Sequence, residues 1–203
     1  MSNLSVFLKG KIGNLFLNFE HYFKNNGITI LYGPNGSGKS TIISALGGFI
    51  NSIETRIIFN GNELHDTDKH PPNKRPFGIM FQNPILFEHL SVEENIDFVI
   101  KKNQIKNQNK SSISKEYLIK HLELNSLLNR SPENLSGGEK LRVVLARTIL
   151  KQPKYLLLDE PMSDLDIKYK AKLLVFLKNF NKKFKIPILY LSLIHISEPT
   201  RHE

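Results

Sequence analysis

The amino-acid sequence predicts an α/β fold in which a mostly parallel β-sheet is flanked by helices. Strand and helix patterns alternate along the chain, which is typical of this class. The strands are short apolar runs, among them "ITILYG", "FGIMFQ" and "YLLLD". The first of these runs ends in a glycine-rich segment that leads directly into a helical stretch.

In the first half of the chain the expected elements follow one another closely. Residues 28–32 form a clear strand, and the helical segment "KSTIISALGGFI" comes soon after it. Residues 55–64, "TRIIFNGNEL", read as a strand that closes on an Asn-Gly turn. A further strand is expected over residues 77–82. Ser91 is the expected N-cap of a helix through "SVEENIDFVIK".

The second half contains a mostly helical region that reads as an insertion into the sheet domain. Its polar, low-complexity segment at residues 101–115 predicts an exposed loop. Two short helical stretches and a longer helix near "GGEKLRVVLARTIL" follow, then a strand over residues 154–159 and a long helix over residues 167–184. Pro187 introduces the last strand. We expect the inserted helical subdomain at about residues 83–140.

The composition is that of a globular domain. The 203 residues are 40% hydrophobic, which is enough for a core, and no apolar run is long enough to cross a bilayer. The N-terminal segment lacks the charged-then-apolar order of a signal peptide. Cysteine is absent, which excludes a disulfide framework and a thiolate metal site.

The net charge of +9 allows two interpretations. A basic chain can bind nucleic acid or a membrane surface. Here the lysines are spread over the whole chain, and the local clusters "IKKNQIKNQNK" and "KNFNKKFK" do not interleave aromatics in the manner of a base-stacking surface. We therefore favour a solvated surface and expect no nucleic-acid partner.

The segment "GPNGSGKST" matches the phosphate-loop pattern, with the expected strand before it and helix after it. Its glycines let backbone N–H groups converge on phosphate oxygens, and the helix N-terminus adds positive potential. Lys39 is placed to reach the β- and γ-phosphates, and the Ser40 hydroxyl to ligate Mg²⁺. The nucleotide-binding residues expected here are Gly33, Pro34, Asn35, Gly36, Ser37, Gly38, Lys39, Ser40 and Thr41.

A second chemical motif is the acidic end of "YLLLDEP". An apolar strand that ends in two carboxylates is common by itself, but here it follows a phosphate loop. Asp159, at the strand tip, is placed to hold the Mg²⁺ shell, and Glu160 to polarise an attacking water.

The segment "LSGGEK" places another anion-binding helix start in the same chain. One nucleotide needs only one such cradle, so the second fits the ATP of a partner subunit. With "FQNPILF", "LLLDEP" and "SDLD" in the same order, residues 4–190 resemble the ATP-binding cassette family of ABC transporters. The resemblance implies a single P-loop NTPase domain over residues 1–190, with an antiparallel N-terminal β part beside the mostly parallel sheet.

The resemblance also assigns roles to particular residues. Ser136, Gly137 and Gly138 would face the nucleotide of the partner in a head-to-tail dimer that holds two ATP molecules. Gln82 matches the glutamine that touches Mg²⁺ or the attacking water, and Asp166 matches a loop that crosses the dimer interface. Glu139 stands where glutamine is more usual. Phe16 is the candidate for stacking on adenine, with an ordinary core role as the alternative.

The implied cofactors are ATP and Mg²⁺, and the implied partners are a second ATP-binding subunit and integral membrane permease subunits. An importer would add a periplasmic solute-binding protein. We expect the protein at the cytoplasmic face of the cell membrane, where it would be held by its contact with the permease. Closure of the dimer on ATP and its reopening after hydrolysis would drive alternating access in that permease.

Several kinds of cassette share this chemistry. The segments "IGNLFLNFEHYFKNNGITILYG", "LSGGEK" and "IPILY" resemble most closely the ATPases of molybdate importers, whereas "PPNKRP" and "GGF" are equally similar to those of thiamine importers. The transported substrate does not bind to this subunit, so the choice between molybdate and thiamine importers rests on analogy. Exporter cassettes and soluble cassette ATPases of DNA repair or the ribosome stay as alternatives.

The end of the chain departs from the family. The family's spacing from Glu160 places a histidine that contacts the γ-phosphate at position 193, which is Leu193 here, and His195 is the only histidine nearby. The segment "LSLIHISEPTR" resembles the translation of a transposase adapter used in shotgun sequencing libraries. We expect that the native sequence is interrupted, and so truncated, at about Tyr190. Residues 191–203 would then be a non-native tail. We also expect weak ATP hydrolysis by the chain as written. A genuine tail with a displaced His195 is the alternative.

Overall fold

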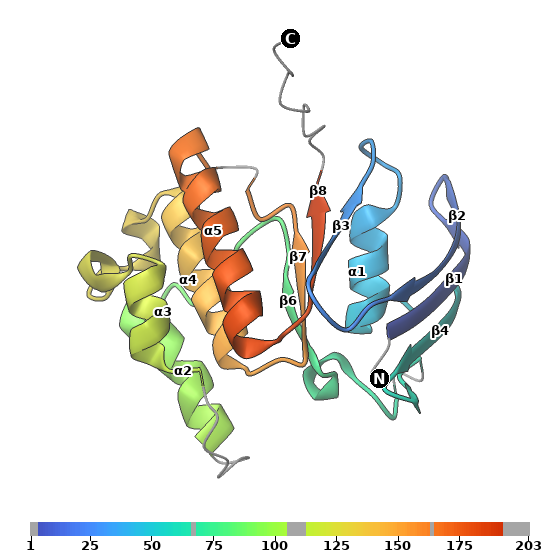
Figure 1. Ribbon diagram of the computed structural model, residues 1–203, viewed down its shortest axis with the longest axis horizontal. Helices are drawn as coiled ribbons and strands as arrows, with labels where there is room; N and C mark the ends of the chain where they lie inside the picture. The colour runs from blue at the N-terminus through green and yellow to red at the C-terminus, as the bar shows by residue number, and fades with distance from the viewer. Residues whose placement is uncertain (1–3, 66–67, 105–112, 163–164, 193–203) are drawn as a thin grey trace.

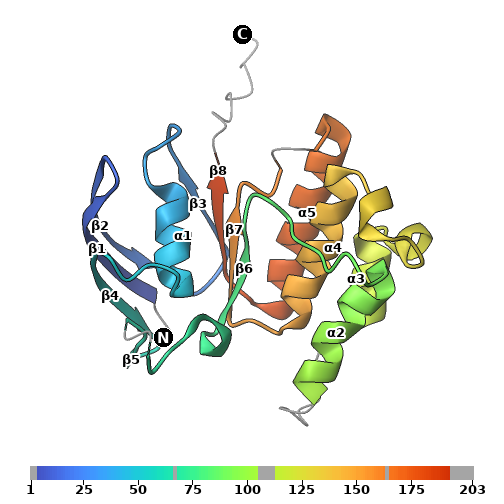
Figure 2. The same cartoon turned by 180° about the vertical axis from the view of Figure 1, so that it is seen from behind.

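A computed structural model describes residues 4–65, 68–104, 113–162 and 165–192 of the chain. Figure 1 shows two sheets with helix α1 (Lys39–Gly47) between them and the remaining helices on the far side of the second sheet. Figure 2 shows the same layers from behind. The predicted α/β class is confirmed, as is the antiparallel sheet at the N-terminal end.

The first sheet is antiparallel, with strand order β2-β1-β4-β5. Its strands are β1 (Leu4–Ile12), β2 (Leu15–Phe23), β4 (Glu54–Phe59) and β5 (Asn62–Glu63). The β4–β5 turn is the predicted Asn-Gly turn: Asn60 has φ 54° and Gly61 has φ 80°. Positive φ at both central residues is the signature of a type I′ hairpin.

The second sheet is parallel throughout, with strand order β3-β8-β7-β6. Its strands are β3 (Ile28–Tyr32), β6 (Phe77–Met80), β7 (Tyr155–Asp159) and β8 (Ile188–Ser192). All five residues of β7 are buried, because helices and the other sheet cover both of its faces. This explains why β7 reads as a continuous apolar run rather than an alternating one.

The helical region carries most of the remaining elements. Its helices are α2 (Val92–Gln104) and α3 (Lys115–His121), with 3-10 turns at Asn125–Leu127 and Pro132–Asn134; a further 3-10 turn, Pro72–Lys74, precedes β6. Helix α4 (Gly137–Leu150) and helix α5 (Ile167–Phe184) lie against the parallel sheet. The boundary predicted for the subdomain, residues 83–140, stays a prediction.

The parallel sheet separates two hydrophobic cores. Leu156 and Leu158 of β7 pack with α4 and α5 on one face. Tyr155 and Leu157 pack with α1 and the antiparallel sheet on the other face. Alternate side chains of one strand therefore belong to different cores, as the two-residue period of a strand requires.

One sequence expectation needs adjustment. Helix α2 continues to Gln104, so the loop predicted from residue 101 was wrong for residues 101–104, where lysine and glutamine favour a continuing helix. Strand β8 continues to Ser192 and Leu191 is fully buried; the interruption of the native sequence expected at about Tyr190 stays a prediction. His195 lies outside the described residues, so the non-native tail stays a prediction.

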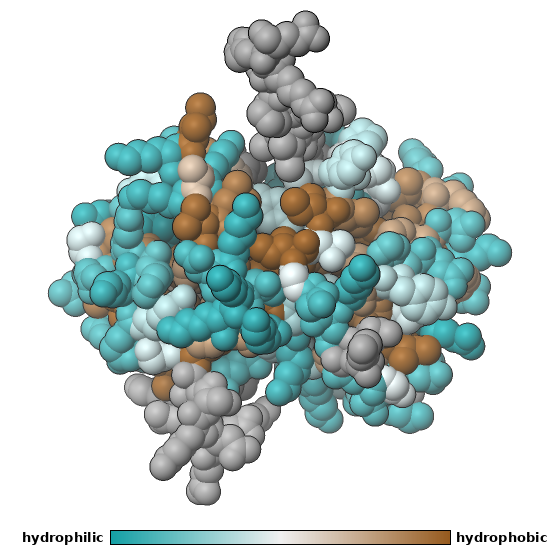
Figure 3. Space-filling view, viewed as in Figure 1, coloured by the Kyte–Doolittle hydropathy of each residue, from teal (hydrophilic) through white to brown (hydrophobic). Residues whose placement is uncertain are grey.

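The surface agrees with the hydrophilic composition. Figure 3 shows that hydrophilic residues predominate on this face, with apolar residues near its centre and in several smaller places. No helix in the part of the chain that the structure describes is both long enough and apolar enough to span a membrane.

Candidate nucleotide site

The phosphate loop connects the carboxyl end of β3 to the N-terminus of α1. Gly38 is the N-cap of α1 and has φ 92°, and Gly36 has φ 76°. A Cβ atom at Gly38 would lie 3.0 Å from the side chains of both Leu15 and Leu17 on β2. Glycine is required at this position because of its backbone conformation and because β2 approaches so closely.

Lys39 fills the centre of this loop. Its side chain is buried, and Nζ donates to the carbonyl oxygens of Gly33 and Pro34, at 2.8 Å in each case. A buried ammonium needs such partners, because burial without them is costly. The loop thus surrounds the ammonium group of Lys39. A phosphate group bound in the loop would lie next to this positive charge.

Asp159 ends β7 beside this loop. It is 3% exposed, and its Oδ1 has no hydrogen-bond partner among the residues that the structure describes. Burial raises the pKa of its carboxyl, while a hydrogen bond with Ser40 and the charge of Lys39 act in the opposite direction. A buried carboxylate oxygen without a partner, next to a hydroxyl, fits the oxygen ligands that Mg²⁺ takes.

Glu160 follows in a strained conformation with φ 48°. Its backbone N–H donates to the carbonyl of Leu191 at 3.2 Å, and its Oε2 accepts from Gln82 Nε2 at 3.3 Å. Burial and the neighbouring Asp159 raise the pKa of its carboxyl, and Lys39 lowers it. Strained residues of this kind are characteristic of functional sites, and a raised pKa suits a group that must accept a proton.

The "LSGG" segment forms the start of α4. Ser136 is its N-cap in a capping box: Ser136 N donates to Glu139 Oε2 at 2.8 Å, and Glu139 N donates to Ser136 Oγ at 3.3 Å. The hydrogen bond from the Ser136 backbone lowers the pKa of Glu139. Glutamate in place of the usual glutamine therefore caps the helix well.

Gly138 allows a close approach at the same helix start. A Cβ atom at this position would lie 2.7 Å from Leu165 Cδ2, in the loop before α5. Helix α4 belongs to the core on the opposite face of the parallel sheet from α1. The "LSGG" segment therefore begins a helix that packs on the other side of the parallel sheet from the helix of the phosphate loop.

Two predicted contacts with nucleotide stay predictions. Asp166 is exposed, and its side chain caps α5 by accepting from Tyr169 N at 2.9 Å. Phe16 is 65% exposed on β2, and strand alternation directs it away from the face on which Leu15 and Leu17 approach Gly38.

Arg75 is a residue that the sequence did not single out. It is 7% exposed, and Nη1 donates to the carbonyls of Ala45 and Leu46 at 3.0 and 2.6 Å, at the C-terminal end of α1. Its Nε donates to His70 O at 3.0 Å. The helix that carries Lys39 is therefore held at its other end by a guanidinium. No local pattern could reveal this, because the partners lie about thirty residues away.

The fold and the loop around Lys39 define a P-loop nucleotide-binding domain. The family pattern described as "ABC transporter" matches residues 16–163, and the chain belongs to this family. The ATP-binding cassette MJ0796, solved as a dimer in a post-hydrolysis state with ADP and Pi, superposes with a TM-score of 0.75 at 26% identity, covering 95% of this chain and 88% of that one. A second dimeric structure of MJ0796 gives a TM-score of 0.73 at 25% identity, over 95% and 88% of the two chains.

Curated relatives are closer in sequence. The chain is 39% identical over 193 residues to a "Molybdenum import ATP-binding protein ModC" from Saccharophagus degradans, covering 94% of this chain and 51% of the relative. It is 38% identical over 184 residues to the protein of the same name from Escherichia coli K12, covering 89% and 50%. The chain thus spans about half the length of the curated relatives it matches.

Proposed function

We propose that this protein is the ATP-binding and ATP-hydrolysing subunit of an ABC importer for a small oxyanion, with molybdate as the favoured substrate. The observation that carries the proposal is the grouping of Lys39, Asp159, Glu160 and Gln82 at the carboxyl edge of the parallel sheet. In an open α/β sheet this edge is where ligands bind.

Each residue has a task in this proposal. The N–H groups of the phosphate loop and Lys39 bind the phosphates, with Lys39 exchanging its two carbonyl partners for phosphate oxygens. Ser40, Asp159 and Gln82 would hold Mg²⁺, which supplies charge neutralisation when bound. Glu160 orients a water and accepts its proton, and Gln82 holds the Glu160 carboxylate in place.

A dimer completes the site. The "LSGG" segment lies on the opposite face of the sheet from the chain's own phosphate loop, so its anion-binding helix start is available to a second subunit. The dimeric state of the MJ0796 structures supports this arrangement. Ser136, Gly137 and Gly138 would then contact the partner's ATP, with Asp166 at the interface and Phe16 as the candidate adenine contact.

The transported substrate is proposed from the relatives' printed name, molybdenum import. Integral permease subunits and a periplasmic binding protein would complete the system, with this subunit at the cytoplasmic face of the cell membrane. An importer of thiamine type is the second candidate, because the "PPNKRP" and "GGF" segments resemble it equally. Exporter and soluble cassettes remain further alternatives.

The test compares the chain with its Lys39→Met variant. We measure binding of a fluorescent ATP analogue with Mg²⁺, and then phosphate release. The parent should bind, and the variant should bind about 100-fold more weakly, because it loses a charge-assisted contact to phosphate. Lys178→Met, at an exposed position on α5, is the matched control. Equal binding by Lys39→Met and the parent would refute the proposed site.

A further inference from the structure

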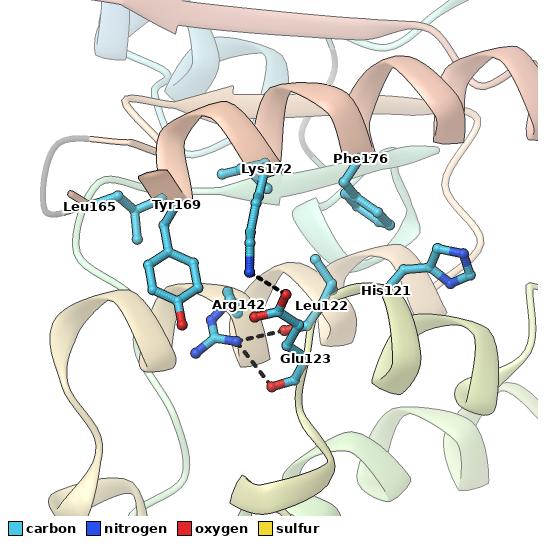
Figure 4. Close-up of a pocket in the computed structure, with 9 residues that line it drawn as sticks. His121, Leu122, Glu123, Arg142, Leu165, Tyr169, Lys172 and Phe176 are labelled. Atoms are coloured by element: carbon cyan, nitrogen blue, oxygen red, sulfur yellow. Dashed lines mark hydrogen bonds and ion pairs between the residues drawn. The ribbon is translucent and has the colours of Figure 1, made fainter. Parts of the chain in front are cut away.

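A small pocket lies where the helical region meets α5 (Figure 4). The end of α3, the first half of α4 and the first half of α5 form it, together with Leu165 from the preceding loop. Four of its polar lining residues interact directly with one another: Glu123, just after α3, Arg142 of α4, and Tyr169 and Lys172 of α5. None of these four residues belongs to the phosphate-binding residues.

The first set of contacts closes the end of α3. Glu123 follows the C-cap of this helix and has φ 53°. Arg142 of α4 donates from Nη1 to the carbonyls of Leu122 at 2.8 Å and of Glu123 at 3.0 Å. Carbonyls at a helix end lack partners within the helix, so the guanidinium supplies them and ties α3 to α4.

The second set ties α3 to α5. Lys172 Nζ lies 2.6 Å from Glu123 Oε1, and this ion pair is drawn as a dashed line in Figure 4. The ring of Tyr169 lies 5.0 Å from the Arg142 guanidinium carbon and 5.2 Å from Lys172 Nζ, which are cation–π distances. One carboxylate, two cations and one ring therefore join three helices.

A separate aromatic contact anchors the other part of α3. The rings of Tyr117 and Phe184 are 5.2 Å apart in an edge-to-face arrangement, and Lys183 Nζ lies 4.2 Å from the Tyr117 ring. Helix α3 thus touches α5 at an apolar contact and at an ionic contact. The edge-to-face packing of the two rings does not depend on salt, whereas the ion pair is weakened by salt and is lost when either charge is removed.

These helices also carry the predicted dimer contacts. Helix α4 begins directly after Ser136, and Gly138 is packed against Leu165. Helix α5 begins directly after Asp166. Any change in the angle between α4 and α5 must therefore move the "LSGG" segment relative to the loop that precedes α5.

We propose that Glu123 and Lys172 are positioning residues that set the orientation of the "LSGG" segment for ATP-driven dimerisation. This inference rests on the proposed function. The two side chains are each 47% exposed, so their ion pair is weak and screened by salt. It is suited to adjusting an orientation, and the fold does not depend on it.

The test uses the full chain in a Glu160→Gln background, so that bound ATP is not consumed. Dimerisation with saturating Mg-ATP is measured by sedimentation velocity for Glu123→Gln, Lys172→Met and the charge-exchanged pair Glu123→Lys/Lys172→Glu. Each single variant should weaken the dimer by about two- to twentyfold, because every dimer contains two such pairs. The exchanged pair should recover most of the loss, and Lys178→Met should dimerise like the parent.

Two further readouts separate the possible outcomes. ATP binding to the monomer should stay within about twofold in every variant, since the phosphate loop is untouched. Hydrogen exchange at the end of α3 should rise in the single variants even without ATP. Unchanged dimerisation in the single variants would overturn the positioning role, whether or not exchange at the end of α3 rises. A parent that binds no ATP would overturn the proposed function, whereas the exchange measurement would still test the contact.

Discussion

Gln82 Nε2 donates a hydrogen bond of 3.3 Å to Glu160 Oε2, and so joins the end of the β6 segment to the end of β7. The two residues lie 78 positions apart in the chain. The contact gives Glu160 a defined orientation beside Asp159 and the phosphate loop. It is also a weak, exposed contact, so that a nucleotide or a bound water can replace it.

The first prediction concerns this contact. Gln82→Ala should lower the rate of ATP hydrolysis on the order of 100-fold, because a catalytic group that is displaced even slightly loses its alignment. ATP affinity should change little, since Lys39 and the loop are intact. Steady-state phosphate release and nucleotide binding, measured on the same preparations, check both parts. A variant with unchanged turnover would show that Gln82 does not position Glu160.

The second prediction concerns the backbone of Glu160. A non-glycine residue at φ 48° is strained, so Glu160→Gly should raise the free energy of unfolding by about 1 kcal/mol relative to Glu160→Gln. Both variants should lose hydrolysis, because both lack the carboxylate. Urea unfolding gives the comparison, and the glutamine variant serves as the control because it keeps the strain. Equal stabilities would mean that the left-handed conformation costs nothing here.

The third prediction concerns the pH dependence of stability. Burial raises the pKa of Asp159 in the folded state. The carboxyl of Asp159 therefore contributes fully to stability at a pH below its pKa in the unfolded chain, which is about 4. This contribution is lost as the pH rises through the raised pKa of the folded state. Asp159→Asn removes this loss. At neutral pH, without nucleotide or divalent cations, the variant should be more stable by on the order of 1 kcal/mol.

Urea unfolding over a pH series tests this directly. Because Asp159 is itself one cause of the raised pKa of Glu160, both proteins carry Glu160→Gln, so that the difference between them isolates Asp159. The two stability curves should converge near pH 4 and diverge as pH rises. Curves that stay parallel over the whole range would contradict the assignment of a raised pKa to Asp159.

The fourth prediction concerns Arg75. Arg75→Met removes the guanidinium that donates to the carbonyls of Leu46 and Ala45, and Ala45 O keeps only the Gly48 N–H; the loss should cost about 1–3 kcal/mol of unfolding free energy. ATP affinity should fall as well, since α1 also carries Lys39. Arg56→Met, at an exposed position on β4, is the matched control and should change stability by less than about 0.5 kcal/mol. A loss of stability in both variants alike would point to charge rather than to the α1 contact.

Local features of the fold could be predicted from the sequence. The long helix over residues 167–184 has the predicted bounds, because Asp166 caps its start and its apolar residues repeat with helical spacing. The Asn60-Gly61 turn and the Ser91 cap are equally local, with Ser91 Oγ accepting from Glu94 N at 3.2 Å. Each of these signals acts within a few residues of the chain.

Long-range features could not be predicted by the same means. Nothing in the sequence of β3 indicates that β8, from the far end of the described chain, pairs with it. The burial of Arg75 and the contact of Gly138 with Leu165 also depend on how distant segments pack. The end of α2 was misplaced because a polar segment was taken for a loop, although its residues are acceptable in a helix.

Helix α1 is held by contacts at both of its ends. Nine residues give it a length of about 14 Å, with the phosphate loop at one end and the Arg75 guanidinium at the other. Arg75 in turn belongs to the segment that leads into β6 and Gln82. Arg75 therefore connects the helix that carries Lys39 to the segment that leads to Gln82. The phosphate loop and Gln82 are thus connected through α1 and Arg75, a connection within the protein that is separate from any bound nucleotide.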